Sequence, residues 1–173
     1  MSKLILIVWL AVCAPAFACH VGKPVDTPLG RLVSAEGKAK IQTDDGMVTA
    51  KDPETLCLVT FTGKSEIPHA SAGARADYFL MVDQGTGKSF TVLYAGSPER
   101  DGSLSARAWK MTGQMTFQGG QPKFSGTASV PSRTVVLIYR IPMSARRLVL
   151  RHGGQTYSIS GLPGRAGGAG KAA

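Results

Sequence analysis

The chain has few cysteines, few aromatic residues and few charged residues for its 173 positions. Its three cysteines form no Cys-x-x-Cys pair, and no Gly-x-Ser-x-Gly or His-Glu-x-x-His motif occurs. The common zinc, redox, hydrolase and metalloprotease signatures are therefore absent. We expect a protein that is not an enzyme and that holds no cofactor.

Long apolar runs are also missing, except at the start of the chain. Lys3 is followed by the apolar run 4–14, and Ala16-Phe17-Ala18 then places small residues at −3 and −1 of a cleavage site. This order of zones predicts a cleavable signal peptide over residues 1–18. The apolar run has eleven residues, whereas a membrane-spanning helix needs roughly 20. We therefore expect a periplasmic or secreted protein.

Cleavage at this site would make Cys19 the first residue of the mature chain. One interpretation is a lipoprotein anchored through Cys19, although Ala16 and Phe17 fit a plain signal-peptidase site better. Another is a Cys19–Cys57 disulfide, because an oxidising compartment favours pairing of two remaining thiols. A third is that Cys57 is a buried core thiol within its apolar run. The sequence leaves these alternatives open.

Negative charge is scarce, and the formal net charge is +9. Without Lys3, nineteen basic residues face eleven acidic ones. The basic residues are spread along the chain and lack interleaved aromatics, so a nucleic-acid partner is not expected. Solubility explains the charge, or else the partner is a protein or an anionic envelope component such as a polymer or lipid. The candidate anionic-surface residues are the closely spaced Arg140, Arg146, Arg147 and Arg151.

Short β-branched and apolar segments separated by turn signals follow the signal peptide. They predict an all-β sandwich over residues 38–160, with an extended segment and a first edge strand in 19–37 and a flexible Gly-rich tail over 161–173. Residues 63–75 are polar and small and are predicted to be a loop. The predicted strands are 38–42, 56–62, 78–82, 89–94, 123–130, 134–141, 147–151 and 156–159.

Residues 104–117 fit two patterns. Leu104, Ala108, Met111 and Met115 have helical spacing, but Gly113 and the surrounding Ser and Thr residues favour strand. We predict strand. Trp109, within this segment, is either a core residue or an exposed binding platform.

Copper binding is the sharpest functional alternative, because thioether and thiolate ligands suit Cu(I). The weak candidate ligands are Met111, Met115, Cys19 and His20, with Met81 and Met143 on other elements. The opposing interpretation is that methionine fills gaps in the core. None of these residues forms a dense Met/His cluster.

Three segments carry a family likeness: Tyr139-Arg140-Ile141-Pro142, Leu148-Val149-Leu150, and the hairpin from Asp83 to Phe90. Over residues 55–160 the chain resembles the DUF4352/telokin-like group of exported immunoglobulin-like domains. The resemblance implies an immunoglobulin-like β-sandwich in an exported, non-enzymatic interaction protein. It supplies no catalytic residues.

Overall fold

The computed structural model describes residues 23–70 and 79–159, and within them the chain is all-β, without helices. The predictions on the signal peptide, Cys19, His20 and the tail 161–173 lie outside the described residues. The strands are β1 Val25–Thr27, β2 Gly30–Lys38, β3 Lys40–Thr43, β4 Gly46–Thr49, β5 Glu54–Thr62, β6 Glu66–Ala70, β7 Leu80–Asp83, β8 Ser89–Phe90, β9 Val92–Pro98, β10 Leu104–Ser105, β11 Lys110–Gln118, β12 Gln121–Ser129, β13 Thr134–Pro142, β14 Leu148–His152 and β15 Gln155–Ser158.

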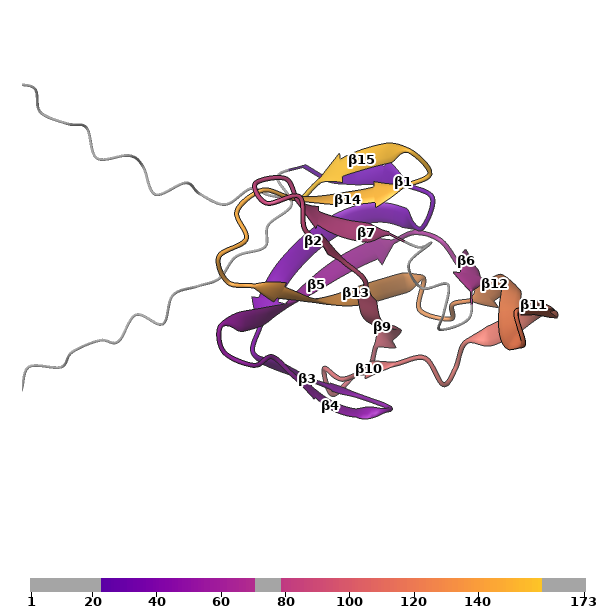
Figure 1. Cartoon of the computed structure of the whole chain (residues 1–173). Coiled ribbons are helices and arrows are strands. Elements are labelled where there is room, and N and C mark those ends of the chain that lie inside the picture. Colours follow the sequence, from indigo (N-terminus) through magenta and orange to yellow (C-terminus); the bar gives the residue numbers. More distant parts are fainter. Residues whose placement is uncertain (1–22, 71–78, 160–173) are drawn as a thin grey trace, which may run out of the picture.

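The strands form three sheets, an arrangement consistent with a β-sandwich (Figure 1). The largest sheet has the order β1-β2-β5-β13-β9-β10-β3-β4, and a four-stranded sheet has the order β15-β14-β7-β8. The third sheet is β11-β12-β6. Nearly all neighbours are antiparallel, and the exception is the short parallel contact of β10 with β3.

The central strands β5 and β13 are buried on both faces, as their nearly unbroken apolar sequences require. One face carries Val59, Phe61 and Leu137, which pack against Met81 of β7 and Leu150 of β14 in the larger core cluster. This cluster joins the large sheet to the four-stranded sheet and forms the interior of the sandwich.

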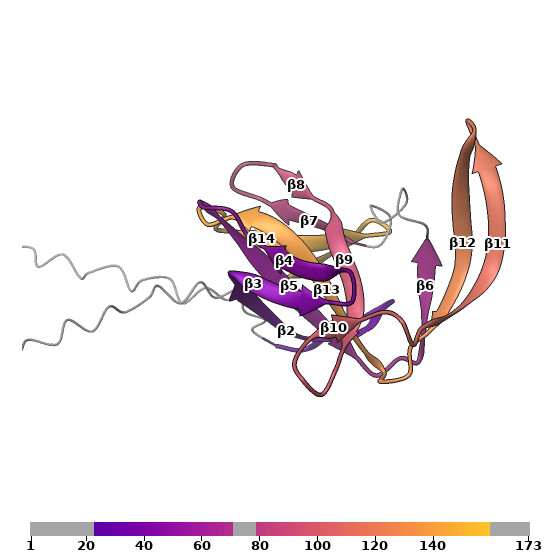
Figure 2. The ribbon, with the colours of Figure 1, turned by 90° about the horizontal axis from the view of Figure 1, so that it is seen from below.

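The opposite face of the central strands is covered by the end of the same large sheet. The segment β10-β3-β4 lies below the central strands in Figure 1, and β3 and β4 lie in front of them in Figure 2. Ile41 of β3 and Leu104 of β10 pack there against Leu58, Tyr94 and Ile138. The curled sheet thereby encloses a second, smaller core cluster.

The third sheet projects from this body, and β11 and β12 form its outer hairpin (Figure 2). Its base is held in the larger core cluster by Ile67, Ala128 and Trp109. Trp109 is 8% exposed, and its indole N–H donates to Ser97 Oγ at 2.9 Å. Trp109 is therefore a core residue and not an exposed platform.

Most strand predictions hold, and two need correction. The strand character of 104–117 is confirmed, but the segment is divided by a turn into β10 and β11, which belong to different sheets. The predicted loop 63–75 contains β6, a five-residue strand with Pro68 at its centre that pairs with β12. The first predicted strand is also not an edge strand: β2 lies between β1 and β5, because β1 turns back along it. The predicted extended segment 19–37 thus contributes to the main sheet.

The Tyr139 hydroxyl gives a direct test of the contact between the two main sheets. The side chain of Tyr139 is fully buried, and its hydroxyl donates to the carbonyl of Phe79 at 3.1 Å. Tyr139→Phe leaves that carbonyl without its donor, so we expect a loss of about 1–2 kcal/mol in the free energy of unfolding, measured in urea. Tyr157→Phe is the matched control. The Tyr157 hydroxyl donates to the exposed Gln155, where water can replace the hydroxyl. The loss in free energy of unfolding should therefore be smaller for this variant.

Candidate functional site

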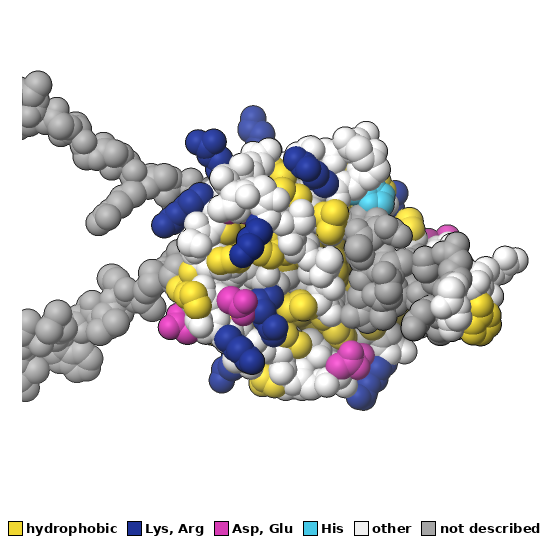
Figure 3. All heavy atoms as spheres, viewed as in Figure 1, with side chains coloured by type: hydrophobic (Ala, Val, Ile, Leu, Met, Phe, Trp, Pro, Cys, Tyr) yellow, Lys and Arg dark blue, Asp and Glu magenta, His cyan; other side chains and the backbone are white. Residues whose placement is uncertain are grey.

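An exposed apolar face lies on β11. Side chains at alternate positions of a strand share a face, and here these are Met111, Gly113, Met115 and Phe117. Met111 is 42% exposed, Met115 60% and Phe117 73%. Only two other large apolar side chains of the described residues are comparably exposed, Val25 and Met47. The yellow side chains at the far end of the hairpin in Figure 3 mark this face.

The backbone of the same residues faces the open edge of the sheet. Gly119 and Gly120 form a two-residue turn with positive φ at both positions (59° and 77°), which pairs Gln118 with Gln121. Such a turn makes the flanking pair, Gln118 and Gln121, a hydrogen-bonded pair. Along the hairpin, hydrogen-bonded pairs then alternate with pairs that are not hydrogen-bonded to each other. The N–H and C=O groups of Met111, Gly113, Met115 and Phe117 therefore point away from β12.

No described strand lies along this edge of β11. Its nine pairs with β12 run without a bulge, and Lys110 is its one charged residue. The other edge of the same sheet, β6, includes Pro68, which has no N–H to donate. Natural edge strands are usually protected by proline, charge or bulges. β6 has such a device, whereas the middle of β11 has none.

The candidate copper ligands are only partly brought together. Met111 and Met115 share the exposed face of β11, but Met81 is fully buried in the larger core cluster. Met143 is half-buried after β13. Within 23–70 and 79–159, no group of three or more His, Cys, Asp or Glu residues could hold a metal ion. The alternation of apolar side chains along β11 accounts for the position of Met111 and Met115 on one face.

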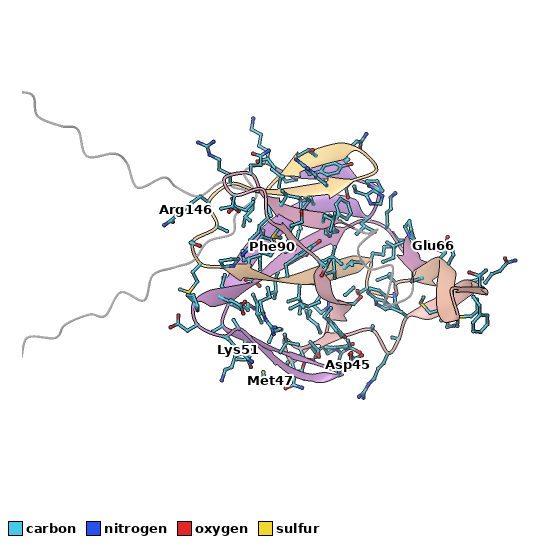
Figure 4. All side chains as sticks on the ribbon, in the orientation of Figure 1. Asp45, Met47, Lys51, Glu66, Phe90 and Arg146 are labelled. Atoms are coloured by element: carbon cyan, nitrogen blue, oxygen red, sulfur yellow. The ribbon has the colours of Figure 1, made fainter. Side chains whose placement is uncertain are left out.

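The four candidate anionic-surface residues lie in three places. Arg140 reaches the carbonyl of Thr49 at 3.2 Å, and its Nε lies 3.5 Å from Glu54 Oε2, so it is engaged on the face of β13 that carries the second cluster. Arg146 and Arg147 are exposed in the loop after β13, and Arg151 is exposed on β14. Figure 4 shows Arg146 pointing away from the body. Arg151 lies opposite Leu80 at the start of β7, away from the loop that holds Arg147. Of the four candidates, only Arg146 and Arg147 therefore lie together.

A second loop adds a lysine beside these arginines. The N–H of Gln84 donates to the carbonyl of Arg147 at 2.8 Å, and the N–H of Asp83 donates to that of Lys88 at 2.9 Å. The turn from β7 to β8 therefore lies against the loop with Arg146. Burial raises the pKa of Asp83, but hydrogen bonds from Gly85, Thr86 and the neighbouring loop lower that pKa by more. The net result is a pKa below the usual 3.8. We define the exposed Lys88, Arg146 and Arg147 as the cationic end.

Cys57 occupies the position that the core-thiol interpretation requires. Its side chain is completely buried, and it lies opposite Tyr139 across β5 and β13. Burial, together with the charge that Cys57 would carry if ionised, raises the pKa of Tyr139 well above 10. The partner in the alternative disulfide, Cys19, is outside the described residues, so that pairing stays a prediction.

Asp44, in the turn between β3 and β4, is the centre of a hydrogen-bond network. Its carboxylate accepts hydrogen bonds from the Tyr94 and Ser105 hydroxyls and from the N–H groups of Ala106 and Arg107. Its own N–H donates to the carbonyl of Leu104 at 3.1 Å. The network ties the β3–β4 turn to β10 and so holds the curled end of the sheet in place.

A shallow depression beside this network offers little chemistry. Asp44 lines it together with Asp45, Glu99, Ser103 and Arg107. Burial raises the pKa of Asp44, but the four hydrogen bonds that its carboxylate accepts lower that pKa by more. The net result is a pKa below the usual 3.8. Burial and the neighbouring Asp44 raise the pKa of Tyr94. Near neutral pH the pair is carboxylate and phenol, and the carboxylate oxygens are occupied by the protein itself, which suits a structural role.

Two parts of these surfaces escaped the sequence analysis. Phe117 was not predicted, because it lies outside the helical pattern that Met111 and Met115 share. The signal was the strict alternation of apolar and polar residues in 111–118, which is typical of a strand with two different faces. Lys88 had no such signal, because only the contact between two distant loops places it beside Arg147.

The Asp44 network predicts a pH-dependent loss of stability. We expect Asp44→Ala to lower the free energy of unfolding by about 2–4 kcal/mol near pH 7, because hydrogen bonds to a charged group are lost. The folded-state pKa is below the usual 3.8, so this contribution is present above pH 3.8 and disappears as the pH falls through the folded-state value. Urea unfolding at several pH values measures it.

The neighbouring exposed carboxylate gives the control for this prediction. Asp45→Ala removes a similar charge from the same turn but should change stability by less than about 0.5 kcal/mol. Equal losses in the two variants at every pH would contradict the role of the Asp44 network.

No helix among the described residues is long and apolar enough to span a membrane. Comparison of the chain with protein-family models, with curated proteins and with solved structures finds no match. The resemblance to the telokin-like group therefore stays a prediction, and the functional argument rests on the surfaces of this chain itself.

Proposed function

We propose that the protein is a non-catalytic interaction module that works outside the cytoplasm and binds an extended polypeptide along β11. The observation that carries the proposal is that four residues, Met111, Gly113, Met115 and Phe117, supply both the apolar face and the outward-directed backbone groups. A strand added to a sheet edge needs both, because main-chain hydrogen bonds supply affinity and side chains supply specificity.

The anchoring of the hairpin supports this function. Trp109, Ile67 and Ala128 fix its base in the core, so the binding edge is held by the body of the protein. Side chains of a partner strand paired beside β11 would contact Met115 and Phe117 on the same face and remove part of their apolar area from water, at about 25 cal/mol per Å². The folded chain by itself leaves these two side chains in water without any such gain.

Three further parts of the proposal come from the sequence and from the chemistry of the depression. An extracytoplasmic location rests on the predicted signal peptide. An immunoglobulin-like form of the sandwich rests on the resemblance and fits its mostly antiparallel strands. The non-catalytic character is supported by the saturated carboxylate of Asp44.

Selection of peptides from a random display library against the exported, purified protein tests the main proposal. We expect selected peptides to protect the amides of residues 111, 113, 115 and 117 from hydrogen exchange. Phe117→Lys should weaken their binding at least tenfold, because it places a charge in the apolar face. Met47→Lys is the matched control. It changes a side chain that is 54% exposed on β4, away from the hairpin (Figure 4), and should leave binding unchanged.

Peptides whose binding is unaffected by Phe117→Lys, or that protect other strands, would contradict strand addition at β11. Reproducible turnover of a hydrolase or oxidoreductase substrate by repurified protein would contradict the non-catalytic assignment.

The cationic end favours a second candidate function, the binding of an anionic envelope polymer or lipid. Lys88, Arg146 and Arg147 are exposed in two adjoining loops, and the one carboxylate of these loops, Asp83, is buried and hydrogen-bonded. Basic side chains gather toward the left of Figure 3, at the end away from the hairpin. Attraction of this kind is electrostatic and weakens with salt.

Vesicles of phosphatidylglycerol, with phosphatidylcholine vesicles for comparison, test this second function. We expect binding to the anionic vesicles alone, a loss of at least tenfold between low and physiological salt, and a similar loss on combining Arg146→Glu with Arg147→Glu. Arg31→Glu is the control, because Arg31 is exposed beside Thr62, at the opposite end of the large sheet. Salt-independent binding, or equal losses in the two variants, would overturn the assignment.

A further inference from the structure

We infer that the polypeptide bound by β11 is β11 of a second copy of this chain, so that the two three-stranded sheets β11-β12-β6 join into one continuous six-stranded sheet. This inference rests on the proposed function and names its partner. It starts from the symmetry of an antiparallel pair, in which two identical strands meet around a two-fold axis and each contact occurs twice.

One register pairs the apolar residues of β11 with one another. When Gln114 lies opposite Gln114 of the second copy, Met111 lies opposite Phe117 and Gly113 opposite Met115. On the polar face, Thr112 then lies opposite Thr116. Cross-strand aromatic and apolar pairs of this kind stabilise a sheet. A shift by two residues toward the turn leaves Met111 opposite Gly119 and Phe117 opposite Gly113, so both Met–Phe pairs are lost.

The same register satisfies the outward-directed backbone groups. Met111, Gly113, Met115 and Phe117 each have their N–H and C=O on the open edge, as the hairpin geometry requires. In the proposed pairing they become the hydrogen-bonded positions of the new ladder, with about eight main-chain hydrogen bonds between the copies. Gln114 then takes a non-hydrogen-bonded position, where the two Cα atoms approach to about 4.5 Å.

Charge also favours this edge as the place where two copies meet. The whole chain has a net charge of +9, so its copies repel one another over most of their surface. Residues 110–129 contain only Lys110 and Lys123, with no acidic residue. In the proposed register Lys110 lies opposite the uncharged Gln118. The hairpin also projects from the body, which leaves its edge accessible to a second molecule (Figure 2).

Site-specific cross-linking tests the partner and the register together. The exported full chain is prepared with Cys19→Ala, which leaves the buried Cys57 as its one thiol if the signal peptide has been removed. Under mild oxidation, Gln114→Cys should form a covalent dimer on its own, because two opposed Cys residues at this separation fit disulfide geometry. Thr112→Cys should remain monomeric alone and should cross-link when mixed with Thr116→Cys.

Sedimentation of the protein without added cysteines measures the dimer independently. We expect a monomer–dimer equilibrium whose dissociation constant rises at least tenfold with Phe117→Lys and not with Met47→Lys. Removal of residues 161–173 should leave the equilibrium unchanged.

The outcomes separate this inference from the function on which it rests. A monomer at every concentration, with no cross-linking of Gln114→Cys, overturns self-association, while selected peptides that still protect β11 preserve the interaction module. Efficient cross-linking of Met115→Cys in place of Gln114→Cys overturns the register. A dimer that appears only after removal of 161–173 overturns the second copy as occupant and identifies the tail as the segment that covers β11. Failure of both self-association and peptide binding overturns the module itself.

Discussion

The burial of both faces of β5 and β13 is the constraint around which the remaining strands are arranged. A strand that is apolar on both sides needs a cover on each, and the chain supplies two different ones. The four-stranded sheet covers one face, and the curled end β10-β3-β4 covers the other. The second cover consists of short strands, so its position depends on the Asp44 carboxylate that ties its turn to β10.

The projecting hairpin is free of this constraint. Its base contributes Trp109 and Ala128 to the core, whereas Met115 and Phe117 remain in water. Two covers already enclose the central strands, so the fold does not need these side chains for its interior. An exposed apolar strand edge without proline or bulge promotes association, and selection against uncontrolled pairing would normally remove it. The proposed binding role would account for its presence.

Charge and apolar surface are separated along the molecule. The cationic end lies at the loops after β7 and β13, and the sparsely charged hairpin lies at the far end (Figure 1). Long-range repulsion between positively charged copies therefore acts least at the hairpin. This separation permits the two ends to serve different partners, with contact at one end leaving the other accessible.

The sequence by itself determined the all-β class, most strand positions and the strand character of 104–117, because alternation and turn residues are local signals. It did not reveal β6, because five residues with a central proline carry little local strand signal and their pairing with β12 is a long-range contact. It also grouped Arg140 with Arg146, although an ion pair with Glu54 holds Arg140 on another face. The exposure of Met111, Met115 and Phe117 was decided only by the tertiary structure, since apolar alternation predicts two faces of a strand but not which of them the core covers.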